Sequence, residues 1–329
     1  MAPEHDRIPE IALEWHSDGQ GAVLATVIET WGSAPRPVGA QMVVSGEGRM
    51  MGSVSGGCVE GAVVVEAQEA LETGTCRVLE FGVADEEAFA VGLACGGRIR
   101  VLVEPVGLGD GWGVEMLSRL VAARAAREPL AVETVLDGFA RRLVEADAGE
   151  VSAVNDQTFR HVHAPPLRLA IVGAVHIAQS LAVMAQLAGY DVAVIDPRAA
   201  FGSAARFPGE RLIEAWPDAA LAEFGLDGRT AVVTLTHDPK LDDPALLAAL
   251  PSAAFYVGAL GSTRTHAKRV ARLSAAGLTA AHIARIDAPV GLDIGAKSPA
   301  EIAVATLAEM TERLRRPATR PGRSAKDAA

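Results

Sequence analysis

Apolar and polar residues follow two different patterns along this chain. Up to about residue 164, apolar runs typical of strands are mixed with segments in which apolar residues recur at helical spacing. Beyond that point, strand-like and helix-like segments alternate, which is typical of a parallel, doubly wound sheet. We therefore predict an α/β protein, with a small N-terminal α+β domain followed by a C-terminal domain built on a parallel sheet.

The predicted elements fall into two sets. In the first domain we expect helices over residues 6–17, 59–72 and 113–126 and strands over residues 22–30, 40–45, 49–52, 99–105, 130–136 and 140–146. In the second we expect strands over residues 167–172, 191–195, 211–213, 230–235 and 254–257, and helices over residues 218–224, 243–250 and 262–276. Ser298, Pro299 and Glu301 form a cap, a first-turn proline and a capping box, so a last helix starts there.

Turn-forming and polar residues suggest where the domains divide. The polar stretch at residues 148–157 and the Pro165-Pro166 pair supply a break, so we assign residues 1–164 to the first domain and residues 165–316 to the second. Residues 317–329 combine arginine, proline and glycine with few apolar residues. We expect that segment to be a disordered tail.

Composition excludes several classes of protein. Half of the 329 residues are hydrophobic, which is enough to bury real cores. The formal net charge of −11 argues against a nucleic-acid-binding surface, and three cysteines are too few for a disulfide framework. No apolar run reaches the roughly 18 residues of a membrane span, and the N-terminus does not read as a signal peptide. We expect a cytoplasmic protein that does not enter a membrane.

A glycine-rich turn precedes the predicted helix at residues 59–72. Residues 52–60 read GSVSGGCVE, in which Ser55, Gly56 and Gly57 form the turn and Glu60 belongs to the wet side of the helix. N–H groups and the helix dipole at such a start favour an anion, and they can turn the thiol of Cys58 into a thiolate. The alternative is that the two glycines form only a turn and that Cys58 is a small buried apolar residue.

The pairing of a cysteine with two glycines occurs a second time. Cys95, Gly96 and Gly97 come directly before the strand-like run at residues 99–105. The two cysteines, 58 and 95, would then face one site. Cys76 begins an apolar strand without a glycine loop, so we interpret it as a packing residue.

The second domain has the layout of a dinucleotide-binding unit. Gly173 follows the first strand, and Asp196 ends the second strand about 20 residues later, where it would accept hydrogen bonds from ribose hydroxyls. Val175 stands at the second glycine position of the fingerprint, where a β-branched side chain opposes close approach of a pyrophosphate. NAD(P) binding is therefore only a hypothesis. His176 and the His237-Asp238 pair also lie at strand ends, and the turns at residues 258–262 and 291–297 would complete the rim.

Several motifs in one order resemble the XdhC/CoxI family, the accessory proteins of molybdenum hydroxylases. They are residues 32–36 (GSAPR), 52–60, 95–97 with 104–105 (EP), 291–295 (GLDIG) and 298–302 (SPAEI). The resemblance extends from about residue 11 to residue 314 and implies a Rossmann-like C-terminal domain. It also implies a chaperone, rather than an enzyme, that binds the molybdenum cofactor (molybdopterin). Such a protein aids sulfuration of the cofactor by a cysteine desulfurase and inserts it into an apo molybdenum hydroxylase of the xanthine dehydrogenase or CO dehydrogenase type.

This resemblance assigns roles to the candidate residues. Cys58 and Cys95 would contact or ligate the molybdenum, because a thiolate is a soft ligand for a transition metal. Arg36, the only charge in its loop, would bind the phosphate or an oxo group together with Gly56 and Gly57. The cofactor-binding candidates are Arg36, Ser55, Gly56, Gly57, Cys58, Glu60, Cys95, Gly96, Gly97, Gly173, His176 and Asp196.

Other readings of the same residues remain open. The chain could be an NAD(P)-dependent oxidoreductase with His237 as acid and base, although Val175 argues against it. Cys58 could instead carry a persulfide, which needs an accessible thiol but no pterin site. A zinc site is a weaker alternative, because the cysteines lack close spacing and His161 and His163 are distant in sequence. A homodimer is expected from the size of the chain alone.

Overall fold

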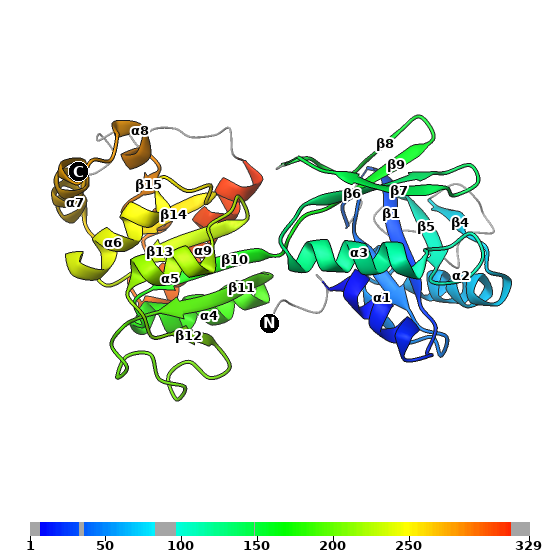
Figure 1. The fold of residues 1–329 in the computed structure, drawn as a ribbon, viewed down its shortest axis with the longest axis horizontal. Coiled ribbons are helices and arrows are strands. Elements are labelled where there is room, and N and C mark those ends of the chain that lie inside the picture. The colour runs from blue at the N-terminus through cyan, green and yellow to red at the C-terminus, as the bar shows by residue number, and fades with distance from the viewer. Residues whose placement is uncertain (1–6, 33–35, 83–96, 148, 317–329) are drawn as a thin grey trace. The chain divides into compact units, whose positions relative to one another are not determined.

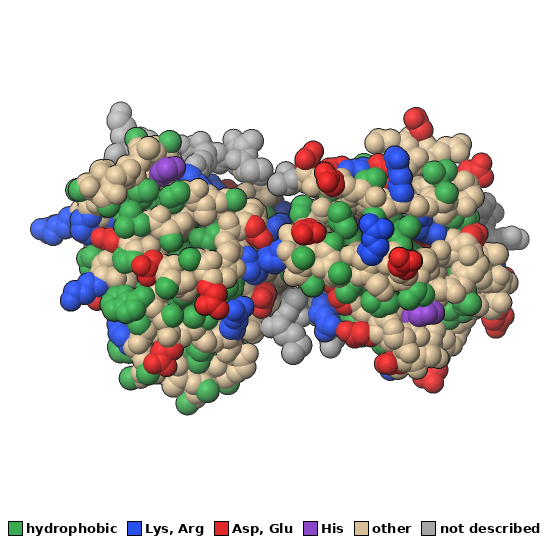
Figure 2. Space-filling model, in the orientation of Figure 1, with side chains coloured by type: hydrophobic (Ala, Val, Ile, Leu, Met, Phe, Trp, Pro, Cys, Tyr) green, Lys and Arg blue, Asp and Glu red, His purple; other side chains and the backbone are tan. Residues whose placement is uncertain are grey.

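The chain divides between Pro165 and Pro166 into two compact units, whose helices and strands are labelled in Figure 1. This computed structural model describes residues 7–32, 36–82, 97–147 and 149–316. The predicted tail at residues 317–329 and the Cys95-Gly96 pair lie outside the described residues. Acidic and basic side chains are interspersed on the visible face of each unit (Figure 2).

The described residues of the N-terminal unit form two antiparallel sheets and three helices. The five-stranded sheet has the order β3-β2-β1-β5-β4, and the four-stranded sheet has the order β7-β6-β9-β8. The strands are β1 (Val23–Trp31), β2 (Gln41–Val44), β3 (Met50–Gly52), β4 (Arg77–Phe81), β5 (Arg98–Pro105), β6 (Leu130–Val135), β7 (Arg141–Glu145), β8 (Ala153–Asn155) and β9 (Thr158–His163). The helices are α1 (Ile8–Ser17), α2 (Glu60–Thr73) and α3 (Val114–Ala125).

Strand β1 is buried on both faces because helices cover both sides of it. Successive side chains of a strand point to opposite faces. Val23, Ala25 and Val27 therefore pack with Val63 and Ala67 of α2. Leu24, on the other face, belongs to a cluster with residues of α1 and α3, which are Ile8, Ala12, Leu117 and Leu120. This arrangement explains why residues 23–28 of β1 are apolar apart from the buried Thr26, rather than alternating between apolar and polar.

The C-terminal unit is a six-stranded parallel sheet of order β12-β11-β10-β13-β14-β15. Its strands are β10 (Leu167–Val172), β11 (Tyr190–Ile195), β12 (Arg211–Ile213), β13 (Thr230–Thr234), β14 (Tyr256–Ala259) and β15 (Ile286–Asp287). Its helices are α4 (His176–Leu187), α5 (Pro217–Phe224), α6 (Pro239–Ala249), α7 (Thr263–Ala275), α8 (Ala280–Ile283) and α9 (Pro299–Arg315). The predicted doubly wound parallel sheet is confirmed.

Each face of this sheet has its own core. Leu169 and Ile171 of β10 pack toward α4 and α9, while Ala170 and Val172 pack toward α5, α6 and α7. The capping box predicted for the last helix is present, because the Ser298 hydroxyl accepts from Glu301 N and the Glu301 carboxylate accepts from Ser298 N. Of the helices in the described ranges, none has both the length and the apolar content needed to cross a bilayer.

Several boundaries differ from the sequence prediction. The polar stretch at residues 148–157 is not a break, because β8 lies inside it and forms a hairpin with β9. In the C-terminal unit, α6 begins at Pro239 rather than residue 243, since Asp238 caps it by accepting a hydrogen bond from Lys240 N. The fifth predicted strand is shifted to Tyr256–Ala259, and α8 and β15 were not predicted.

Candidate functional site

The glycine-rich turn before α2 is organised around one buried carboxylate. Glu60 is 5% exposed and is the first residue of the helix. Its Oε1 accepts hydrogen bonds from Ser53 Oγ at 2.7 Å, Ser55 N at 2.9 Å and Val54 N at 3.2 Å. Its Oε2 accepts from Gly57 N at 2.9 Å and from the Ser55 hydroxyl. The prediction that Glu60 belongs to the wet side of the helix is therefore wrong.

Two serine hydroxyls satisfy the remaining N–H groups of this turn. Ser55 Oγ accepts from Cys58 N and Val59 N, both at 2.9 Å, and Ser53 Oγ accepts from Gly56 N at 2.9 Å. Every backbone N–H from residue 54 to residue 59 thus has an acceptor within the turn. The expectation that Gly56 and Gly57 offer free N–H groups to a bound anion is wrong, because Gly56 N donates to Ser53 Oγ and Gly57 N donates to the Glu60 carboxylate.

The charge of Glu60 is strongly stabilised in the folded protein. Burial raises the pKa of this carboxyl, but hydrogen bonds from the Ser55 and Ser53 hydroxyls and from backbone N–H groups outweigh that effect and lower the pKa to about 2. A negative charge at the start of α2 also interacts favourably with the helix dipole. The helix start is therefore neutralised from within, which removes the electropositive setting that the sequence suggested for Cys58.

Glycine is required where this turn begins and where it bends. Gly52 has φ = 85°, and a Cβ there would collide with the carbonyl oxygen of Gln41. Gly57 has φ = 113°, with open space where a Cβ would be. Cys58, which follows, is exposed. The turn thus presents the thiol of Cys58 to solvent, rather than burying it as an apolar residue.

Three segments of the predicted site leave the five-stranded sheet at the same end. Trp31, the last residue of β1, is paired with Arg98, the first residue of β5. Strand β3 runs antiparallel to β2, as β1 does, so the turn that follows Gly52 leaves the sheet at this end as well. The loop that carries Arg36, the turn that carries Cys58, and Gly97 therefore lie toward the same end of the sheet, although Gly52 is level with Ala25, six residues before Trp31. Cys95 and Gly96 lie outside the described residues.

Arg36 carries a spare donor at this end of the sheet. The residue is half-buried, and its Nε is enclosed without a hydrogen-bond acceptor among the residues that the structure describes. A buried donor without an acceptor costs roughly 1–3 kcal/mol, and an anionic ligand can remove that cost. Arg36 is consequently the residue of this group best placed to bind a phosphate or an oxo group.

Metal ligands are sparse in this unit. Within the described ranges, no three His, Cys, Asp or Glu side chains are grouped as a metal site. His161 and His163 are buried, and their rings contact each other at a tilt of 47°, with centroids 4.0 Å apart. The His161 Nε2 lies 3.2 Å from the carbonyl oxygen of Gly39. The two histidines therefore contribute to the core, as does Cys76.

Cys76 is a buried thiol in a polar network that the sequence did not reveal. Arg141 Nη2 donates to its Sγ at 3.0 Å, and the thiol donates to the carbonyl oxygen of Asp110 at 3.3 Å. Arg141 also pairs with the buried carboxylate of Glu104 at 2.6 Å, which accepts from Trp112 Nε1 at 3.1 Å. Burial raises the pKa of Cys76 to about 12. The thiol is therefore buried, as predicted, but its contacts are polar, and it stays protonated.

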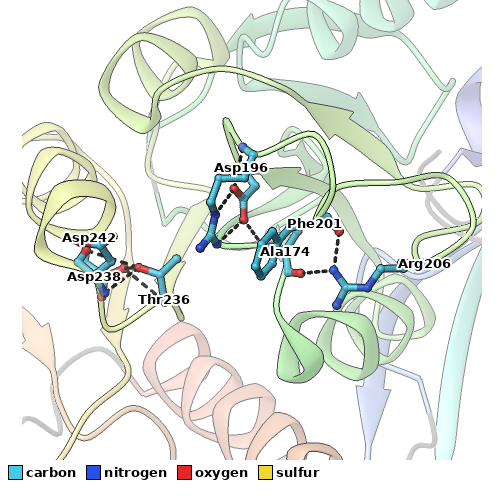
Figure 3. Close-up of polar contacts among 8 residues, drawn as sticks. Ala174, Asp196, Phe201, Arg206, Thr236, Asp238 and Asp242 are labelled. Carbon is cyan, nitrogen blue, oxygen red and sulfur yellow. Dashed lines mark hydrogen bonds and ion pairs between the residues drawn. The ribbon is translucent and has the colours of Figure 1, made fainter.

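In the C-terminal unit, Asp196 binds the chain itself rather than facing an open crevice. Its carboxylate accepts from Ala174 N at 2.8 Å, from Arg198 N at 3.0 Å, and from Arg198 Nε and Nη2 at 2.8 and 2.7 Å (Figure 3). Burial raises the pKa of Asp196, but the bonds from Arg198 and Ala174 lower it further than burial raises it. Ribose hydroxyls would have to displace Arg198. This arrangement opposes the role predicted for Asp196.

The neighbouring strand ends are equally occupied by internal contacts. Gly173 has φ = 105°, and a Cβ there would collide with the methyl group of Thr236. The Thr236 hydroxyl donates to Asp242 Oδ1 at 2.6 Å and accepts from Asp238 N at 3.1 Å (Figure 3). Asp238 caps α6 instead of orienting its neighbour His237, which is exposed. His176, the first residue of α4, is also exposed.

Comparison with known proteins places both units in one group. A family model described as the XdhC and CoxI family matches residues 15–82, and a model described as the XdhC Rossmann domain matches residues 169–310. The molybdenum cofactor insertion chaperone PaoD of Escherichia coli (strain K12) is 34% identical over 310 residues, which cover 94% of this chain and 89% of that protein.

Two further proteins are similar over nearly their whole length. A probable subunit of xanthine dehydrogenase from Bacillus subtilis (strain 168) is 30% identical over 320 residues, covering 91% of this chain and 95% of that protein. A crystal structure described as a xanthine dehydrogenase from Bacillus halodurans superposes with a TM-score of 0.76 at 26% identity, covering 96% of this chain and 98% of that one. The folds of both units are thus shared with a solved structure.

Proposed function

The chain belongs to the XdhC and CoxI family, and on that premise we propose that it binds the molybdenum cofactor and inserts it into an apo molybdenum hydroxylase. The name of its relative PaoD supports this role. The cofactor is cargo here, and no residue is assigned a catalytic step. Aid to sulfuration by a cysteine desulfurase, a homodimeric state and a cytoplasmic location belong to the same proposal.

The binding site that we propose is the end of the five-stranded sheet where Arg36, Cys58 and Gly97 lie. The half-buried guanidinium of Arg36, with its unsatisfied Nε, is the observation that carries the assignment. It fits the anionic phosphate of a molybdopterin, because guanidinium and phosphate form charge-assisted hydrogen bonds. The exposed thiol of Cys58 is a soft ligand for the molybdenum end. Glu60 stabilises the turn through its hydrogen bonds, and we assign it no contact with the cofactor.

Copurification tests this site. The full chain is expressed together with cofactor biosynthesis, and bound molybdenum and pterin are measured in purified protein. Arg36→Ala and Cys58→Ala should each retain at most about one tenth of the wild-type cofactor, since a charge-assisted contact is worth about 1.5–3 kcal/mol. Arg119→Ala removes an exposed cation from α3 and serves as a matched control. Equal retention by Arg36→Ala and Arg119→Ala would show that the assignment of Arg36 is wrong.

A persulfide carrier is the second candidate, because Cys58 is exposed on a fixed turn. The protein is incubated with a cysteine desulfurase and cysteine, then digested for mass spectrometry. A transferable adduct of about 32 Da on Cys58, the mass of one sulfur atom, would favour this function. Absence of the adduct together with normal cofactor retention would leave insertion as the function.

A further inference from the structure

A small basic pocket lies at the carboxyl end of the parallel sheet, in the other unit from Arg36 and Cys58. It has a volume of about 260 Å³ and lies between α6 and α7, beside His237, which follows β13. Arg264, Thr265 and Lys268 from the first turns of α7 line it together with the buried pair Asp242 and Arg269. Ligands of open parallel sheets bind at the carboxyl ends of the strands, which is where this pocket lies.

Positive charge exceeds negative charge in this pocket. Arg272 at its rim is neutralised by Asp243, with contacts of 2.5 and 2.9 Å. Arg264 and Lys268 are exposed, and neither has an acidic partner among the residues that the structure describes. Arg269 faces Asp242 at 3.6 Å, too far for a hydrogen bond. Two cations therefore remain uncompensated around the pocket.

The buried guanidinium of Arg269 has unused donors. Arg269 is 1% exposed, and its Nη2 donates to the carbonyl oxygen of Leu260 at 2.7 Å. Its Nε and Nη1 have no acceptor in the described part of the chain, and Oδ2 of Asp242 has no donor there. Burial of a charged side chain with unsatisfied donors is unfavourable. An anion in the pocket would lower this cost, because it would place a negative charge beside the guanidinium.

The first turn of α7, from which Arg264 and Thr265 line the pocket, also has backbone N–H groups without an acceptor in the described part of the chain. Ser262 caps the helix by accepting from Thr265 N, and its carbonyl oxygen accepts from His266 N. The N–H groups of Thr263 and Arg264 have no acceptor among the described residues. Gly261 has φ = 139°, and a Cβ there would lie only 3.0 Å from Thr265 Cγ2. The loop thus approaches the helix closely, while Thr263 and Arg264 in the first turn stay exposed.

We propose that this pocket binds the phosphate group of a phosphorylated ligand. Helix-start N–H groups together with Arg and Lys side chains are the donors that proteins use for phosphate. The volume is below the roughly 300–1,000 Å³ of sites that enclose a whole small molecule, so only the phosphate group is enclosed. Burial raises the pKa of Asp242, which makes it easier for this carboxyl to hold a proton beside an anion. The proposal does not depend on cofactor insertion.

Calorimetric titration of the full chain with inorganic phosphate and with pyrophosphate tests the proposal. The variant Arg264→Ala/Lys268→Ala should bind either probe about tenfold more weakly than wild type, or weaker still. Arg119→Ala/Arg142→Ala removes two positive charges from exposed positions of the N-terminal unit and should bind like wild type. Failure of the wild-type protein to saturate at millimolar probe, or equal affinities of the two double variants, would overturn the proposal.

The phosphate group could come from free phosphate or from a nucleotide. A third titration, with ADP, distinguishes these two ligands. Equal affinity for ADP and inorganic phosphate means that the site takes free phosphate, whereas tighter binding of ADP means that the phosphate belongs to a nucleotide. Either result supports the pocket if Arg264→Ala/Lys268→Ala weakens binding. Binding of ADP that this variant leaves unchanged contradicts it. Cofactor retention is measured separately with Arg36→Ala, so failure here leaves the proposed function intact.

Discussion

Glu60 shows how a single residue can change the interpretation of a motif. The sequence predicted the glycine turn and the helix after it, and both are present. It did not predict that the first glutamate of the helix would fold back and accept five hydrogen bonds from the turn. Helical periodicity alone predicts that the Glu60 side chain lies on the surface. The N–H groups of the preceding turn need acceptors, however, and the buried Glu60 carboxylate supplies them.

Replacement of Glu60 by Gln should destabilise the N-terminal unit. A Gln side chain has one acceptor oxygen, and its amide group faces donors that it cannot satisfy. We expect the free energy of unfolding, measured with urea, to fall by about 2–4 kcal/mol. Glu72→Gln on the exposed end of the same helix should change it by less than about 0.5 kcal/mol. Similar stabilities for the two variants would contradict the bonding described for the turn.

Buried histidines should make the stability of the same unit depend on pH. Burial lowers the pKa of His161 from 6.5 to about 4 and that of His163 well below its ordinary value. Below pH 6.5 the unfolded chain binds protons that the folded chain does not, so stability is highest above pH 6.5 and falls as the pH drops toward 4. The loss from His161 alone is on the order of 3 kcal/mol.

Urea unfolding at several pH values between 7.5 and 4.5 measures this dependence. His163→Leu removes one of the two groups and should make stability vary less over that range, while His176→Gln, an exposed histidine of the other unit, should leave the variation unchanged. If the free energy of unfolding varies with pH equally in wild type and in His163→Leu, then His163 does not contribute to the pH dependence.

Strands were predicted from the sequence where their buried side chains are apolar, and were missed where those side chains are polar. All the C-terminal strands with continuous apolar runs were predicted, because a parallel sheet is buried on both faces. Strand β9 was missed because its inward positions are Phe159, His161 and His163, so two of three core side chains look polar in the sequence. The candidate site was predicted only as segments, since the register that gathers them comes from strand pairing.

The hairpin of β8 and β9 should therefore matter for stability although its sequence looks like a linker. Phe159 is 2% exposed and packs in a cluster with Ile28 and Leu102 of the five-stranded sheet. Phe159→Ala should lower the free energy of unfolding by about 3–5 kcal/mol. Val151→Ala at a 77% exposed position just before the hairpin is the matched control. A loss below about 1 kcal/mol for Phe159→Ala would mean that the hairpin is not part of the core.

At the scale of the whole molecule, each unit has its own hydrophobic core. Within the described residues, the clusters of the N-terminal unit and those of the C-terminal unit share no member. A domain with its own core can in principle fold alone. Residues 166–316 expressed by themselves should therefore unfold cooperatively in urea, with the circular dichroism of a parallel α/β sheet. A fragment without a cooperative transition would show that the C-terminal sheet needs the other unit.

The rigidity of the glycine turn has a thermodynamic consequence for whatever binds at Cys58. Since Glu60 and the two serines fix the backbone from residue 54 to residue 59, the ordering entropy of this loop is lost during folding rather than during association. If Cys58 binds the molybdenum as proposed, the metal meets a preorganised ligand. Calorimetry should then record a small entropic penalty for capture, and loosening the turn through Glu60→Gln should enlarge that penalty even where the thiol itself is untouched.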